Sequence, residues 1–262
     1  MQAGLNPYQI EQFIQDGFVR IEGAFSADDA QEARAILWQD LPGDPNDPAT
    51  WTQSVVRPGM YGQAPFQRAA NTAMLHQAFD QLVGLGRWVP RHNLGTFPVR
   101  FPSAEEPGDT GWHVDASFPG ADPTHYLDWR VNVRSRGRAL LMLFLFSDCT
   151  GQDAPTRLRI GSHRDVATLL HPAGEAGLSF MDLAGKLSEL PDRTETVATG
   201  KAGTVYLCHP FLVHAAQAHH GTEPRFLAQP PLLLRDELTI GDPATGYTPV
   251  EAAIRLGLDD LG

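Results

Sequence analysis

The N-terminal part of the chain alternates apolar and polar positions at helical spacing, with clear start and stop signals. Asn6 can cap a helix, Pro7 suits its first turn, and Gly17 can end it. The next segment, FVRIEGAF at 18–25, is typical of a short strand. Ser26 stands three residues before an acid and predicts the start of a second helix.

The pattern then breaks and changes period. Residues 43–68 are rich in Pro, Gly, Asn and Gln, which predicts a loop region that, with 102–111, is placed to close over a site. From about residue 93 short β-rich segments follow one another between turn signals, and an amphipathic pattern over 249–258 predicts a final surface helix. The strand candidates are 94–101, 112–118, 130–135, 138–146, 156–160, 203–209, 211–217 and 225–234.

Strand candidates behind an N-terminal helical part predict a mainly β protein, a sandwich or barrel with helices packed on one side. A length of 262 residues suits a single domain, 1–262. We expect a helical and loop part over 1–90, a β core over 91–240 and a C-terminal segment over 241–262.

Composition and charge exclude several classes of function. The net charge of −11 argues against non-specific nucleic-acid binding. The longest apolar run, 139–146, has strand length and cannot span a bilayer, and the N-terminus lacks the features of a signal peptide. Cys149 and Cys208 form neither a disulfide framework nor a zinc pattern. We therefore expect a cytoplasmic protein without a membrane or nucleic-acid partner.

Two H-x-D pairs are candidates for metal binding. His113 and Asp115 lie in a segment of strand composition, where residues two apart point to the same face and can reach one ion. His163 and Asp165 lie where a turn enters a helical pattern, and residues two apart do not face one another there. Because Ser162 or Asp165 can cap that helix, a structural role explains the second pair.

An iron site needs a third protein ligand, since two histidines and one carboxylate on one face of an octahedron leave three positions open. The candidates are His209, His214, His219 and His220. His214 is the best of them, because it lies in the most strand-like part, whereas a proline follows His209 and the others fall in a turn. Arg225 comes eleven residues later. We expect 225–234 to fold back as the antiparallel neighbour of the His214 strand, so that the planar fork of Arg225 can bind a carboxylate in the same cavity.

These residues in this order resemble the phytanoyl-CoA dioxygenase-like (PhyH) family of Fe(II)- and 2-oxoglutarate-dependent oxygenases. The similarity covers most of the chain, in the segments 8–34, 111–115, 143–164 and 202–232. It implies a double-stranded β-helix, or jelly roll, buttressed by N-terminal helices. It also implies that His113, Asp115 and His214 bind the catalytic iron and that Arg225 pairs with the distal carboxylate of 2-oxoglutarate.

The chain departs from the family pattern at one position. Ala216 stands where some members carry a small polar residue near the 2-oxoglutarate carboxylate. Thr204, Asn132 and Arg100 are further candidates for holding the cosubstrate, although none maps onto a family motif. Halogenating relatives lack the carboxylate ligand, so the presence of Asp115 favours hydroxylation or a related oxidation.

The resemblance thus implies Fe(II), 2-oxoglutarate and O2 as cofactors, and hydroxylation of an unactivated C–H bond in a small-molecule metabolite with release of succinate and CO2. Two alternatives stay open: a metal-dependent cupin-type isomerase or lyase, which would not need Arg225, and a non-catalytic jelly-roll binding protein. The sequence leaves the substrate open, as it does the choice between a monomer and a homodimer.

Overall fold

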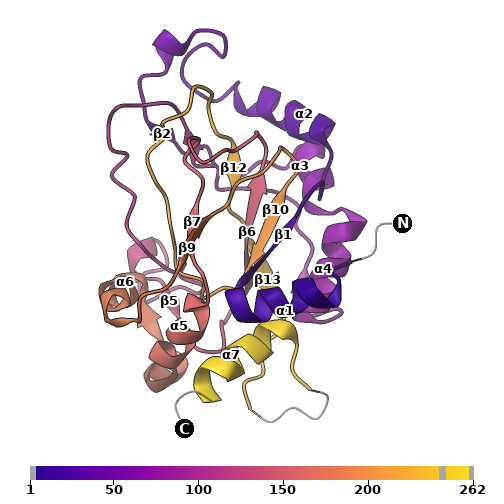
Figure 1. The fold of residues 1–262 in the computed structure, drawn as a ribbon, viewed down its shortest axis with the longest axis vertical. Helices are drawn as coiled ribbons and strands as arrows, with labels where there is room; N and C mark the ends of the chain where they lie inside the picture. Colours follow the sequence, from indigo (N-terminus) through magenta and orange to yellow (C-terminus); the bar gives the residue numbers. More distant parts are fainter. Residues whose placement is uncertain (1–3, 242–245, 260–262) are drawn as a thin grey trace.

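The computed structural model describes residues 4–241 and 246–259, so that 242–245 and 260–262 of the expected C-terminal segment lie outside the described residues (Figure 1). Its centre is a six-stranded antiparallel sheet in the order β1-β10-β6-β13-β3, with β12 paired to β6 as well. These strands are β1 Phe18–Ile21, β3 Trp88–Val89, β6 Arg138–Leu145, β10 Val205–Cys208, β12 Leu227–Ala228 and β13 Pro231–Leu234.

A smaller antiparallel sheet in the order β11-β7-β9 contains β7 Arg157–Arg159, β9 Glu195–Val197 and β11 His214–Ala215. Two further strand pairs are β2 Val55–Val56 with β4 Val99–Arg100, and β5 Arg130–Val131 with β8 Leu178–Ser179. Isolated bridges such as Arg100–Arg225 and His113–His214 join other segments. The expected fold class is confirmed, although the sheets do not close into a continuous barrel.

The helices are α1 Pro7–Asp16, α2 Ala27–Leu37, α3 Ala64–Ala70, α4 Ala73–Val83, α5 Ser162–Leu170, α6 Phe180–Lys186 and α7 Pro249–Asp259; short 3-10 turns are η1 Pro48–Thr50, η2 Tyr126–Asp128, η3 His171–Ala176 and η4 Leu187–Glu189. The predicted caps are confirmed: Asn6 forms a capping box, Gly17 ends α1 with φ 87°, and the Ser26 side chain accepts from Asp29 N. The expected final helix, α7, packs against α1 and α5. None of the described helices is long and apolar enough to cross a lipid bilayer.

Strand β6 is buried on both faces, which explains its continuous apolar sequence. Leu140, Met142 and Phe144 pack into the large hydrophobic cluster with residues from α1 to α4. Their neighbours on the opposite face, Leu141, Leu143 and Leu145, pack with Leu158 of β7 in a second cluster. The core therefore has two layers, one between the helices and the large sheet and one between the two sheets (Figure 1).

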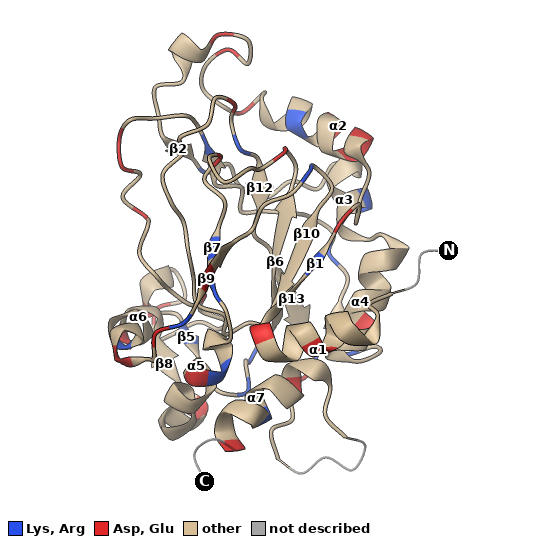
Figure 2. Ribbon diagram, viewed as in Figure 1, with Lys and Arg blue, Asp and Glu red and all other residues tan. Residues whose placement is uncertain are grey.

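The position of charge follows this layering. Strands β10 and β13 carry no charged residue, whereas β7 and β9 contain Arg157, Arg159 and Glu195 (Figure 2). The end residues of β7 are half-buried and those of β9 exposed, because one face of the smaller sheet lies outside the core. Most described charges lie on helices, loops and this outer sheet.

Several sequence expectations about elements were wrong. Residues 112–118 form no regular strand but have isolated bridges at His113 and Phe118. The segment 225–234 is not the neighbour of the His214 strand: it contains β12 and β13, which both pair with β6, and it is interrupted at Gln229 and Pro230 because proline has no N–H for a ladder. Helix α5 has Gly161 as its N-cap, not Ser162 or Asp165. Strands β2, β3, β8 and β9 and helices α3, α4 and α6 were not predicted, and α3 begins within the expected loop region 43–68.

Candidate metal centre

Two histidines from distant parts of the chain meet through their backbones. His113 N donates to His214 O and His214 N donates to His113 O, both at 3.0 Å. Directly opposed residues of an antiparallel pair place their side chains on the same face. The two imidazole rings therefore lie together, with centroids 4.3 Å apart.

Asp115 completes a group of three potential ligands. Its Oδ1 lies 3.9 Å from Nε2 of His113 and 3.9 Å from Nε2 of His214. One ligand atom from each residue lies within 4.8 Å of the others. Two atoms that each bind one ion at about 2.1 Å can be at most about 4.2 Å apart, so the Oδ1–Nε2 distances fit a shared metal ion.

The backbone also fixes which ring nitrogen faces the shared point. Nδ1 of His113 lies 2.9 Å from Gly111 O, and Nδ1 of His214 lies 3.0 Å from Leu212 O. A proton on each Nδ1 satisfies these carbonyls and leaves both Nε2 lone pairs free for a metal. Burial, and then the neighbouring His113, lower the pKa of His214 to about 4, so its imidazole is neutral at pH 7, as a ligand must be.

The sequence did not identify Arg138, the main partner of Asp115. Arg138 Nη1 donates to Asp115 Oδ2 at 2.8 Å. Burial acts to raise the pKa of Asp115, but the opposing causes, of which the charge of Arg138 is the largest, outweigh it and lower the pKa to about 2. The sequence held one signal for this pair: Arg138 is the charged first residue of a strand whose other residues are apolar. A buried arginine needs a charged or polar partner, so its position indicates an ion pair.

A cavity of about 640 Å³ opens beside the two histidines, and both expected loops contribute to it. Residues 43–68 supply Arg57, and residues 102–111 supply Asp109 with two glycines. Trp112 lines the cavity, whereas two other aromatic residues of this region do not: Phe118 lies against Arg136, and Trp129 Nε1 donates to Pro123 O. An apolar wall that the sequence did not predict consists of Leu127, Phe180, Met181 and Ala184.

Two buried arginines lie behind and along one wall of this cavity. Arg100 and Arg225 are directly opposed across an antiparallel bridge, and each is 2% exposed. Arg100 lines the cavity, while Arg225 lies behind it and donates to Pro98 O at 3.1 Å and to Ala154 O. Burial and the charge of Arg100 lower the pKa of Arg225 to about 10.

These guanidinium groups carry more donors than their neighbours satisfy. Asp109 Oδ2 accepts from Arg100 at 2.5 Å and also from Arg57. Nε and Nη1 of Arg100 and Nε of Arg225 are buried and find no acceptor among the described residues. Asp109 thus pairs with two guanidinium groups, and these arginines retain buried N–H donors that an anion could accept from.

The structure does not bring Thr204 and Asn132 into this cavity. Thr204 O accepts from Leu145 N at 2.9 Å, and its side chain packs beside Gly200. The Asn132 side chain donates to Glu175 O at 3.1 Å and accepts from Arg136 N, which orders a turn. Neither residue lines the cavity, whereas Ala216 and Gln229 do.

The second H-x-D pair is divided between two structural roles. His163 is fully buried, and its Nε2 lies 3.0 Å from Ile14 O in α1. Asp165 accepts two hydrogen bonds from Arg193, at 2.6 and 2.8 Å. The pair is absent from the metal-ligating cluster found in the described part of the chain.

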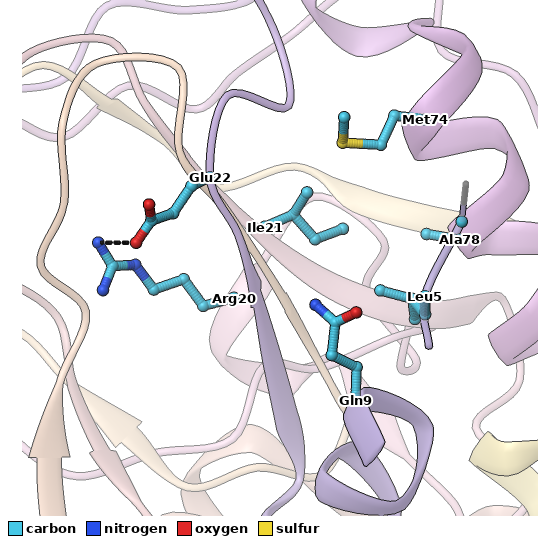
Figure 3. Close-up of a pocket in the computed structure, with 8 residues that line it drawn as sticks. Leu5, Gln9, Arg20, Ile21, Glu22, Met74 and Ala78 are labelled. Carbon is cyan, nitrogen blue, oxygen red and sulfur yellow. Dashed lines mark ion pairs between the residues drawn. The ribbon is translucent and has the colours of Figure 1, made fainter. Parts of the chain in front are cut away.

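Of the remaining histidine candidates, His209 and His219 have backbone partners for their rings, and His220 is exposed. Nε2 of His209 lies 3.2 Å from Val250 O, and Nδ1 of His219 accepts from Gly221 N at 3.1 Å. A separate cavity of about 350 Å³ lies between α1, β1 and α4, where Arg20 and Glu22 form an ion pair at 2.9 Å (Figure 3). It contains no trio of ligating side chains among the described residues.

Together, the fold and the His-Asp-His trio define a jelly-roll protein with three side chains that could hold one metal ion, in the two-histidine, one-carboxylate pattern. The family model of phytanoyl-CoA dioxygenase (PhyH) matches residues 13–227. The chain belongs to this family, which confirms the resemblance found in the sequence.

Solved structures extend the likeness to the fold. The non-heme alpha ketoglutarate dependent epimerase SnoN from nogalamycin biosynthesis is 18% identical, covers 92% of this chain and 91% of its own, and has a TM-score of 0.53. EctD from S. alaskensis is 22% identical over 89% and 78% of the two chains, with a TM-score of 0.54. HygX from Streptomyces hygroscopicus, with nickel and 2-oxoglutarate bound, is 19% identical over 86% of each, with a TM-score of 0.54. A comparison with curated proteins gives no match.

Proposed function

We propose that this chain is an Fe(II)- and 2-oxoglutarate-dependent oxygenase that hydroxylates a C–H bond of a small molecule. The main support is the convergence of His113, Asp115 and His214 beside a cavity whose wall contains a buried arginine. The family membership and the bound nickel and 2-oxoglutarate of HygX support the same assignment.

The trio would hold the iron through the two Nε2 atoms and Asp115 Oδ1, the three atoms that face one another. Three protein ligands on one face leave three positions open. Bound iron and cosubstrate supply the oxidation: O2 is reduced while 2-oxoglutarate loses CO2 to become succinate and a substrate C–H becomes C–OH. The protein residues bind, orient and exclude water.

The arginines Arg100 and Arg225 would neutralise and orient the cosubstrate. 2-Oxoglutarate is a dianion, and the three guanidinium groups of Arg57, Arg100 and Arg225 outnumber the carboxylates of Asp109 and Asp153 that act on them. The donors that lack acceptors in the described protein match the lone pairs of a carboxylate. An isomerase or lyase that uses only the metal would leave this excess of positive charge without a purpose.

The primary substrate would lie against the apolar wall. Phe180 packs on His113 with ring centroids 5.7 Å apart, so a molecule bound there is adjacent to the metal ligands. A cavity of about 640 Å³ has the size that buries a small organic molecule. Apolar side chains at this wall would exclude water from the reacting carbon.

An anaerobic titration tests the proposal. Adding Fe(II) and then 2-oxoglutarate to the metal-free protein should produce the visible charge-transfer absorption of a chelated keto acid, and air should then release succinate. Asp115→Ala is the matched variant and should lose both signals. Metal binding without the absorption band or succinate would favour the isomerase or lyase, and no metal binding would favour a non-catalytic jelly-roll protein.

A further inference from the structure

We propose that Arg138 is a positioning residue that holds the Asp115 carboxylate so that it binds the metal through one oxygen only. The inference rests on the proposed function, because it concerns the same metal centre. It assigns a role to a buried charged side chain that does not itself line the cavity.

The geometry divides the two oxygens of Asp115 between two tasks. Arg138 Nη1 donates to Oδ2 at 2.8 Å, while Oδ1 lies 3.9 Å from each histidine Nε2. The second arm of the fork, Nη2, donates to Ala116 O at 3.1 Å. Nε is buried without a partner among the described residues, so the two Nη contacts set the orientation of the guanidinium group.

The backbone around Asp115 needs such support, because no strand ladder runs through it. It is anchored on one side by the bridge between His113 and His214, and on the other by Ser117 N and Phe118 N, which donate to Arg130 O at 2.8 and 3.1 Å. Between these anchors, the Arg138 fork contacts residues 115 and 116 together.

Arg138 is itself fixed by the fold. It is the first residue of β6, the strand buried on both faces, and only 8% of it is exposed. A planar guanidinium group on a rigid strand can hold a carboxylate in one orientation at a small loss of side-chain entropy. Its charge also offsets that of Asp115, with which it forms an ion pair at 2.8 Å.

Binding through a single oxygen determines how many positions the metal keeps. Two Nε2 atoms and Oδ1 would hold the metal through three protein atoms and leave three positions open for small molecules. If Oδ2 also bound, one of these positions would be lost. By engaging Oδ2, Arg138 keeps the third position open.

Metal affinity and coordination test this role independently of turnover. Arg138→Gln and Arg138→Lys would be compared with Arg136→Gln, a control that removes an exposed arginine two residues away lying over Phe118. Fe(II) affinity would be measured anaerobically against a chromophoric chelator. The coordination of the site would be followed in the visible absorption of Co(II), which responds to the number of bound ligands.

We expect Arg138→Gln to raise the Kd for Fe(II) about 10–100-fold and to alter the Co(II) spectrum, as changes beside metal ligands do. Arg138→Lys keeps the charge without the fork and should lose affinity to an intermediate extent; Arg136→Gln should match the parent. If Arg138→Gln does not fold, the Fe(II) affinity and the Co(II) spectrum of Arg138→Lys decide the test alone.

The idea is overturned if a folded Arg138→Gln protein binds both metals like the parent. Full recovery in Arg138→Lys would also overturn it, since charge alone would then suffice. A parent protein that binds neither Fe(II) nor Co(II) is a different result, which refutes the proposed function rather than the role of Arg138.

Discussion

Lowering the pH from 7 to 5 should destabilise the folded protein through two imidazoles outside the metal centre. His163 and His209 are fully buried, and their ring centroids lie 4.9 Å apart. Burial lowers the pKa of His163 to about 3, and burial and then His163 lower the pKa of His209 well below its ordinary value. Both rings are therefore neutral in the fold and protonate only when it opens.

The sign follows from proton counting. The unfolded chain binds protons at both histidines below a pH of about 6.5, whereas the folded chain does not at pH 5, so stability is fully present above that pH and falls as the pH drops toward the folded pKa. At pH 5 the neutral His163 imidazole lowers the free energy of unfolding by about 2 kcal/mol, and the depressed pKa of His209 acts in the same direction. That loss is large beside a typical total of about 5–15 kcal/mol.

Urea denaturation of the metal-free protein at several pH values measures this loss, and His163→Gln isolates one of the two rings. Glutamine keeps a donor for Ile14 O, which the His163 Nε2 contacts at 3.0 Å, but it does not titrate. Between pH 7 and 5, the free energy of unfolding of the variant should fall by about 2 kcal/mol less than that of the parent protein. Identical pH profiles for the two proteins would show that His163 is not held neutral by burial.

Three other changes test the site. His214→Ala should abolish Fe(II) binding in an anaerobic titration while the metal-free protein still unfolds cooperatively, and retained stoichiometric binding would contradict the trio. Arg225→Met should weaken 2-oxoglutarate by about 2–5 kcal/mol, the usual loss of a buried charged partner, and equal affinity would contradict its role as an anchor. Asp109→Asn should tighten 2-oxoglutarate binding in the same absorption titration, because Arg100 loses the carboxylate it now binds. Weaker binding would mean that Asp109 instead orients Arg100 for the ligand.

The sequence alone determined the features that depend on near neighbours. The caps of α1 and α2 and the apolar run of β6 follow from residues a few positions apart, and all three were predicted. The sequence also selected His113, Asp115 and His214, which the structure brings together, because an H-x-D pair and one histidine in a strand-like segment limit the possible combinations. His113 and Asp115 face the same point even though the regular strand expected there is missing.

Only the tertiary structure decided how distant segments meet. The segment after the last histidines pairs with β6 rather than with the His214 strand, and this brings Arg225 opposite Arg100. Arg138 lies 23 positions from Asp115, and no local periodicity connects them. Such pairings depend on which arrangement buries both faces of β6 and satisfies each buried charge, and these are properties of the whole packed chain.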